Sequence, residues 1–387
     1  MERNKTKNDY IIVSGDVCEN IDKLETCLLL LLERFDKVFF TFGNHDVWIV
    51  DGATKCSLEK IEDIFRLCDR IGVIYEPTEI VADSTTTTTT TSSSSSSSVF
   101  IVPVHSWYHK EFDDEKDCVY PEGVKVPSVE RVMTDYRLCK WPKIDEWRRE
   151  FRDDDGNDEA ILSDDYYIAK KLDALNDIDD CWNRLIAKVA EAKESGKTIT
   201  VISFSHFLPR IELIPEKRFL LYPRLTSAVG SKVLNERLEQ LTSLLGKSDK
   251  HTHAFGHTHF GWNLVLENNV RYVQAALAKP NEWIKRPRSL VVGDFISNLP
   301  GSNALTLYDF KPNSFSGEDD DANTYDPGLW AQYYQENKRN PDNNKTLAPW
   351  VEDYVTRIWG SRELKQQQQK EITAANSVLK EPLMQKW

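Results

Sequence analysis

The chain has 387 residues, of which 40% are hydrophobic and 11 are tryptophan, so it can bury the core of one or two globular domains. Its formal net charge of −13 disfavours a general nucleic-acid-binding protein, because phosphate binding requires clustered lysine and arginine. The 7 cysteines are odd in number and form no C-x-x-C pair. This pattern favours reduced thiols in a reducing compartment over a disulfide framework.

The N-terminal residues show no secretory signal, since residues 1–9 are polar. The longest leucine run, residues 28–32, is far too short to span a bilayer. Residues 21–35 instead carry apolar side chains at helical spacing, which is typical of a helix buried against a sheet. We therefore expect a cytoplasmic protein with no membrane segment.

The first part of the chain predicts a strand-helix-strand unit of a parallel sheet. Branched and aromatic residues favour strands, and apolar residues three and four positions apart favour a helix. In order, the elements are a strand over residues 10–14, a helix over 21–35 and a strand over 37–42. Gly43 then allows a sharp turn. Because both strands run in the same direction, the residues that follow them should lie side by side.

Alternation of helices and strands continues along the chain. We expect helices over residues 58–70, 166–192 and 234–245, and strands near Val73 and over 99–102, 198–204, 262–266, 270–274 and 304–310. A further strand approaches Gly256 and carries His251 and His253 on one face. Those two histidines are expected to serve packing or hydrogen bonding.

Three stretches are expected to lie outside the sheet. Residues 84–98, a threonine run followed by a serine run, bury no apolar surface and predict a disordered insertion. Residues 111–159 are acidic and irregular, and predict a loop-rich excursion. One domain is expected over residues 1–310, followed by a polar extension over 311–387 of loops and isolated helix, which packs through its tryptophans Trp330, Trp350 and Trp359.

Polar residues follow four of the predicted strands. They are Asp16, the run Asn44-His45-Asp46, His206, and the pair His257 and His259. Imidazole, carboxylate and amide ligands suit Mn²⁺, Fe²⁺ or Zn²⁺, and the lack of a thiolate argues against a structural zinc site. A single histidine is more often structural, but this combination at strand ends favours a divalent metal centre.

The motifs Gly15-Asp16, Gly43–Asp46, His206 and Gly256–His259 resemble those of the calcineurin-like metallophosphoesterases, over residues 10–310. The resemblance implies an α/β fold, a β-sandwich flanked by helices, with two divalent metal ions that share one carboxylate.

The resemblance also implies roles for individual residues. Asp16 would bridge both ions. One metal site would be completed by Asn44, His206 and His257, and the other would be served by His259. His45, held by Asp46, would protonate the leaving group or stabilise its charge.

The chain departs from the family pattern at its start. The family's first strand carries a D-x-H motif that supplies two ligands of the site served by His259, but no histidine precedes Gly15. Either the natural protein begins further upstream, so that this chain lacks the first strand and helix, or the site is degenerate. The first explanation is favoured, because drift would also erode His45 and Asp46.

The function predicted from this sequence is metal-dependent hydrolysis of phosphate mono- or diesters by a metal-bridging hydroxide. The substrate would be a phosphorylated small molecule or a nucleotide-like compound. Motifs of the protein Ser/Thr phosphatases do not match, and Glu19 stands where the purple acid phosphatases have tyrosine. The alternative is a catalytically inactive scaffold or binding protein with the same fold, which the missing motif supports.

Overall fold

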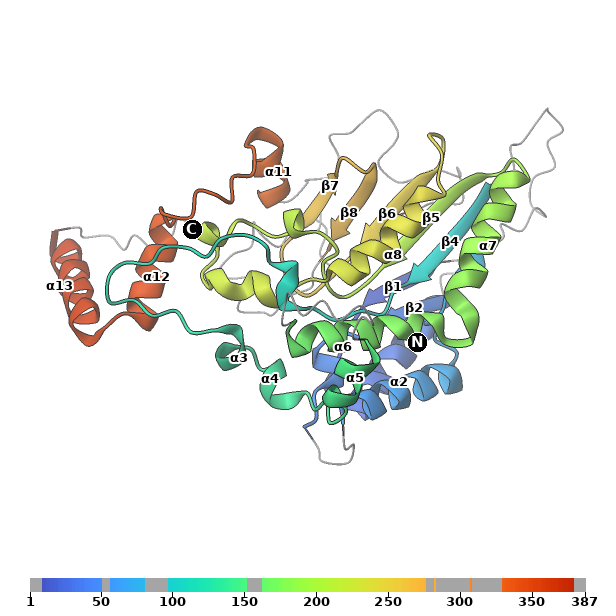
Figure 1. The fold of residues 1–387 in the computed structure, drawn as a ribbon, viewed down its shortest axis with the longest axis horizontal. Coiled ribbons are helices and arrows are strands. Elements are labelled where there is room, and N and C mark those ends of the chain that lie inside the picture. The colour runs from blue at the N-terminus through green and yellow to red at the C-terminus, as the bar shows by residue number, and fades with distance from the viewer. Residues whose placement is uncertain are drawn as a thin grey trace, which may run out of the picture.

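The computed structural model describes residues 9–50, 56–80, 97–151, 162–275, 282, 307 and 329–378. Their strands form a two-stranded sheet and a six-stranded sheet (Figure 1). In the small sheet, β1 (Tyr10–Ser14) pairs in parallel with β2 (Lys37–Thr41). The large sheet, in the order β3-β4-β5-β6-β8-β7, contains β3 (Thr78–Ile80), β4 (Ser97–Pro103), β5 (Thr198–Phe204), β6 (Lys250–Ala254), β7 (Trp262–Val265) and β8 (Val270–Gln274).

Parallel pairing dominates the centre of the large sheet. β4, β5, β6 and β8 run in the same direction, whereas β3 and β7 pair antiparallel at the two edges. The helices that accompany the sheets are α1 (Ile21–Leu32), α2 (Ser57–Ile71), α6 (Asp164–Asp173), α7 (Cys181–Glu194) and α8 (Lys232–Ser243).

The two sheets stack face to face, and helices cover both outer faces. Phe39 of β2 and Ile202 of β5 belong to one apolar cluster between the sheets. Val38 and Phe40 point the opposite way, into a cluster with residues of α1 and α2, as expected for a strand buried on both faces. α7 and α8 cover the other face of the large sheet (Figure 1). The predicted β-sandwich flanked by helices is therefore confirmed.

The helix predicted over residues 166–192 is wrong in its middle. α6 and α7 are separated by the 3₁₀ segment η4 (Ala174–Asp180). Within it, Asp179 and Asp180 adopt left-handed φ angles of 50° and 59°. A right-handed helix cannot continue through such residues, so the chain turns here between two helices.

The strand predicted near Val73 and the end of the predicted insertion differ from the structure, and the strand predicted over residues 304–310 is not tested. The strand near Val73 is reduced to an isolated bridge between Ile74 and Phe39. β4 already begins at Ser97, whereas the rest of the threonine/serine stretch lies outside the described residues. Of the strand predicted over residues 304–310, only Leu307 is described.

The excursion and the C-terminal extension pack against each other, since Val124 of the excursion and Val351 of the extension belong to one apolar cluster. Among its described residues, the excursion contains the short helices η3 (Lys110–Phe112), α3 (Val129–Val132), α4 (Asp135–Leu138) and α5 (Ile144–Glu150). The extension forms α11 (Leu329–Glu336), α12 (Pro349–Trp359) and α13 (Arg362–Val378), and is more helical than predicted. Its three predicted packing tryptophans lie within 5.3–6.0 Å of the rings of Phe219 and Tyr222.

The structure also bears on the cysteines and on membrane-spanning helices. All seven cysteines are free thiols. None of the described helices is long and apolar enough to cross a bilayer.

Candidate metal centre

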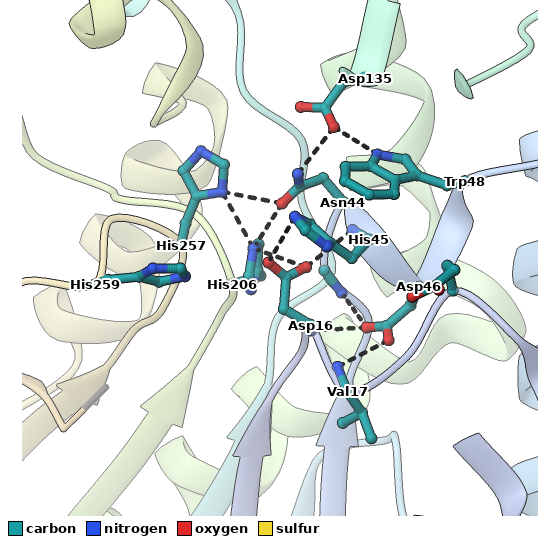
Figure 2. Close-up of polar contacts among 12 residues, drawn as sticks. Asp16, Val17, Asn44, His45, Asp46, Trp48, Asp135, His206, His257 and His259 are labelled. Atoms are coloured by element: carbon teal, nitrogen blue, oxygen red, sulfur yellow. Dashed lines mark hydrogen bonds and ion pairs between the residues drawn. The ribbon is translucent and has the colours of Figure 1, made fainter. Parts of the chain in front are cut away.

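The candidate site lies where four strands end. Asp16 follows β1, Asn44 follows β2, His206 follows β5 and His257 follows β6. Parallel pairing of β1 with β2, and of β5 with β6, brings the carboxyl ends of each pair together. Nδ1 of His206 donates to the carbonyl oxygen of Ser14 at 2.7 Å and so joins the two sheets. The structure thus gathers four of the predicted ligands (Figure 2).

The four side chains each present one atom to a common point. Oδ1 of Asn44 lies 2.9 Å from Nε2 of His206 and 3.0 Å from Nδ1 of His257. The two imidazole nitrogens are 3.2 Å apart. Oδ1 of Asp16 lies 3.3 Å from Nε2 of His206. We call these four atoms the ligand cluster.

When both histidine rings are neutral, the atoms of the ligand cluster carry lone pairs and no hydrogen of their own. Because Nδ1–H of His206 is used in the bond to β1, its Nε2 is bare in the neutral ring. His257 donates Nε2–H to the carbonyl oxygen of Ala228 at 2.9 Å, which leaves its Nδ1 bare. Asn44 donates Nδ2–H to Asp135 at 2.9 Å, so its Oδ1 faces the histidines. Such atoms repel one another unless a cation or a proton lies between them.

The spacing of the ligand cluster fits a divalent transition metal ion. Metal–ligand bonds of about 2.0–2.2 Å place neighbouring ligands about 2.8–3.6 Å apart in octahedral or tetrahedral sites, and the four distances between atoms of the cluster are 2.9–3.3 Å. The backbone carbonyls that hold the second ring nitrogens fix the tautomers, as is usual for histidine ligands. The residues present therefore fit the predicted metal site that contains Asn44.

The charges of the ligand cluster also favour a bound cation. Burial acts to raise the pKa of Asp16, but attraction by His206, His45 and His257 outweighs it and lowers that pKa. Burial acts to lower the pKa of His206, but the neighbouring Asp16 raises it overall. Burial and repulsion by His206 lower the pKa of His257 to about 3. The lowered pKa values keep Asp16 ionised and His257 neutral near pH 7, and both forms can bind a cation.

Three of the predicted ligands have backbone conformations that side chains rarely adopt. The φ angles of Asp16, His257 and His259 are 56°, 70° and 56°. Aspartate and histidine tolerate this left-handed region better than most residues, and such strain is concentrated at functional sites. Beside Asp16, Gly15 has a φ of 77°, and a Cβ there would overlap the backbone of Gly43. The close approach of the two strand ends therefore requires glycine.

His45 lies at the edge of the ligand cluster. Its backbone N–H donates to Oδ1 of Asp16 at 2.9 Å, and its Nε2 lies 3.9 Å from Oδ2 of the same carboxylate. The imidazole stacks on the indole of Trp48, with ring centroids 3.7 Å apart. With 28% of its side chain exposed, His45 is accessible to a substrate that reaches the site.

The carboxylate of Asp46 accepts four backbone hydrogen bonds. Its Oδ2 accepts the backbone N–H groups of Asp16 and Gly43, both at 2.8 Å. Its Oδ1 accepts those of Val17 and Cys18, both at 2.9 Å. The fully buried carboxylate therefore joins the loops that follow β1 and β2. The predicted contact between Asp46 and the ring of His45 stays a prediction.

His259 lies apart from the ligand cluster (Figure 2). Its Nδ1 lies 2.9 Å from Oε2 of Glu282, and both side chains are partly exposed. Among the described residues, the candidate ligand atoms that gather within 4.8 Å belong to Asp16, His206 and His257. The structure thus gathers the ligands of one predicted metal site, whereas the site of His259 stays a prediction.

Two residues near the site were missed by the sequence analysis. Asp135, which is 2% exposed, accepts hydrogen bonds from Nδ2 of Asn44 and from Nε1 of Trp48. Trp48 in turn supports the ring of His45. Asp135 lies in the irregular excursion and belongs to no motif, so no sequence signal marks it. Trp48, an aromatic residue two positions after the Asn-His-Asp run, could have drawn attention from the sequence.

The two histidines of β6 serve hydrogen bonding, as predicted. Oγ of Ser203 contacts Nε2 of His251 at 2.7 Å and Nδ1 of His253 at 2.8 Å. His251 also contacts Oγ1 of Thr242, and His253 contacts Oγ of Ser205. Burial lowers the pKa of His251 to about 3. Both rings therefore belong to a neutral polar network inside the large sheet.

The sequence of this chain is similar to that of a known phosphodiesterase. The acyl-carrier-protein phosphodiesterase PptH of Mycobacterium tuberculosis is 28% identical to this chain over 281 residues, which cover 72% of each protein. The match supports the predicted relationship to the calcineurin-like metallophosphoesterases. No family model matches the chain.

Two solved structures are also similar to this chain. One is the phosphopantetheinyl hydrolase PptH from Mycobacterium tuberculosis, with a TM-score of 0.42 and 21% identity, covering 76% of this chain and 88% of that one. The other is a dimetal phosphatase from Danio rerio, with a TM-score of 0.30 and 11% identity, covering 69% and 71%. Both TM-scores lie below 0.5 and indicate partial superposition.

Proposed function

We propose that this protein hydrolyses phosphate esters with the help of a divalent metal ion bound at the ligand cluster. One observation carries the proposal. Oδ1 of Asn44, Nε2 of His206 and Nδ1 of His257 lie 2.9–3.2 Å from one another, and Oδ1 of Asp16 lies 3.3 Å from Nε2 of His206, so four atoms that can each offer a lone pair face a common point. The sequence relationship to a phosphodiesterase supports the same conclusion.

Each residue then has a chemical task. A divalent ion at the cluster would supply positive charge for the phosphate oxygens and lower the pKa of a water molecule. Asp16, Asn44, His206 and His257 would hold that ion. His45, exposed beside Asp16, would donate a proton to the leaving oxygen or stabilise its charge. No protein nucleophile is required, because water attacks the phosphorus in line with the leaving oxygen.

A second divalent ion would extend the same site. Asp16 would contribute its other carboxylate oxygen, and His259 would contribute a ring nitrogen. The carboxylate of Glu282 at Nδ1 of His259 would leave Nε2 of that ring for the metal. Metal content per chain, measured with His259→Ala as the comparison, tests this part separately.

The substrate proposed is a phosphodiester with one protein-linked side. The relative PptH is named as a phosphodiesterase of acyl carrier protein and as a phosphopantetheinyl hydrolase. We extend that chemistry to this chain, in place of the free small molecule expected from the sequence. The net charge of −13 gives no support to a nucleic-acid substrate.

Hydrolysis assays with two variants test the proposal. With Mn²⁺, the protein should hydrolyse bis(4-nitrophenyl) phosphate, and should release 4′-phosphopantetheine from a phosphopantetheinylated carrier protein. His45→Ala should keep Mn²⁺ binding while lowering kcat by about 10²–10⁴-fold. His257→Ala should lose both Mn²⁺ binding and turnover. Unchanged turnover in both variants would contradict the site assignment.

The inactive scaffold remains the alternative function. It predicts a folded protein that shows no hydrolysis of either substrate under any divalent metal. It also predicts that His45→Ala binds the partner of the scaffold as well as the wild-type protein does. Metal-dependent turnover that is lost in His45→Ala would exclude it.

A further inference from the structure

Asp135 connects two functional residues through a single oxygen atom. Its Oδ1 accepts Nδ2–H of Asn44 at 2.9 Å and Nε1–H of Trp48 at 2.6 Å (Figure 2). It lies at the start of α4, 87 and 91 positions from these two partners. Asp135 is buried, and burying a carboxylate destabilises a fold unless hydrogen bonds compensate for the lost hydration.

The first of these bonds determines which atom Asn44 turns toward the ligand cluster. The carbonyl oxygen and the NH₂ group of an amide side chain have similar sizes, but only the oxygen can bind a cation. Because Asp135 accepts from Nδ2, the Oδ1 atom faces His206 and His257. Without that acceptor, the amide could rotate and point two N–H groups at the metal position.

The second bond fixes the aromatic ring beneath His45. The indole of Trp48 is held by its only polar atom, and the imidazole of His45 stacks on it at 3.7 Å, with an interplanar angle of 28°. His45 also donates its backbone N–H to Asp16 of the ligand cluster. The ring orientation of the proposed acid therefore depends on the same carboxylate as the ligand Asn44.

We infer that Asp135 is a positioning residue that orients the metal ligand Asn44 and, through Trp48, the proton donor His45. The inference rests on the proposed function and deepens it. It assigns to one buried carboxylate the task of keeping the metal ion and the acid at a fixed separation. Outer hydrogen-bond partners of metal ligands commonly change metal affinity by about 10–100-fold.

Two substitutions at Asp135 separate orientation from mere packing. Asp135→Leu has similar bulk but no acceptor, and should weaken Mn²⁺ binding by about 10–100-fold in titration calorimetry. Asp135→Asn keeps one oxygen that can accept both donors, and should bind Mn²⁺ within about tenfold of the wild-type protein. The matched control is Asp173→Leu, because Asp173 is also largely buried and hydrogen-bonded, but its side-chain partner is Arg237, which lies in α8. It should leave Mn²⁺ affinity unchanged.

Trp48→Phe tests the hydrogen bond between Trp48 and Asp135 while Asp135 itself stays unchanged. Phenylalanine keeps a ring beneath His45 but removes the N–H that Asp135 holds. The titration of His45, followed by NMR of the protein with ¹³C-labelled histidine, should shift, whereas Mn²⁺ affinity should stay within about threefold. His45→Ala assigns the resonance among the 8 histidines.

The outcomes distinguish this inference from the proposed function. If the wild-type protein binds no Mn²⁺ at all, both are overturned. If it binds Mn²⁺ and hydrolyses the diester, but folded Asp135→Leu has the same affinity and the same His45 titration, only the positioning role is overturned. Should Asp135→Leu fail to fold, Trp48→Phe decides, and an unshifted His45 titration overturns the inference.

Discussion

Asp46→Asn should destabilise the protein and weaken metal binding, although the two side chains have nearly the same size. One carboxylate oxygen accepts the N–H groups of Val17 and Cys18, and the other accepts those of Asp16 and Gly43. Asparagine keeps a single acceptor oxygen and presents an NH₂ group in place of the second. Two of the four backbone N–H groups would then face this NH₂ group, which cannot accept a hydrogen bond.

The size of the effect follows from those lost acceptors. Each unsatisfied buried N–H group costs about 1–3 kcal/mol, so the free energy of unfolding should fall by about 2–6 kcal/mol. That is a large fraction of the roughly 5–15 kcal/mol typical of a folded protein. Because the backbone N–H of Asp16 is one of the groups that Asp46 holds, the carboxylate of Asp16 should also move. Mn²⁺ affinity should therefore fall by about tenfold or more.

Urea unfolding and titration calorimetry on the same preparation measure both effects. Asp22→Asn, at an exposed position in the first turn of α1, is the control, and should change stability by less than about 1 kcal/mol. The reasoning is refuted if Asp46→Asn keeps wild-type stability and Mn²⁺ affinity. If that variant then lost turnover and changed its pH profile, Asp46 would act on His45, as the family resemblance implies.

Three further results are expected. Gly43→Ala should lower Mn²⁺ affinity in calorimetry, because its Cβ would overlap the carboxylate of Asp16 and lie 2.7 Å from Cε1 of His206; Gly246→Ala, where the nearest atom would be 3.4 Å away, should not. Mn²⁺ affinity should fall about tenfold per pH unit below the raised pKa of His206, because a proton then competes for Nε2, and a flat pH dependence would contradict this. In thermal unfolding, removing Mn²⁺ from about 100 times its Kd should withdraw about 2.7 kcal/mol of stabilisation, and His257→Ala should show no such change.

The gathering of the ligand cluster could be predicted because it depends on local patterns. The run from Val38 to Phe40 is recognisable as a buried strand, and parallel neighbours end at the same edge of a sheet. Asn44 and Asp16 therefore had to lie close together. His206 and His257 follow two further parallel neighbours, and the stacking of the two sheets brings all four residues together.

The remaining features depend on contacts that no periodicity encodes. Asp135 reaches Asn44 across 91 positions from a short helix in an irregular region. The four backbone partners of Asp46 become visible only when the loop after β1 has its three-dimensional path. In the region predicted as one helix, the left-handed conformations of Asp179 and Asp180 override the helical spacing on both sides.

The central claim is that the ligand cluster binds a divalent metal ion. Anomalous diffraction from Mn²⁺-soaked crystals of the wild-type protein and of His257→Ala tests it most directly. We predict a strong wild-type peak bounded by Oδ1 of Asp16, Oδ1 of Asn44, Nε2 of His206 and Nδ1 of His257, and its loss in the variant. A Mn²⁺-saturated wild-type crystal with no peak among these atoms would contradict the account.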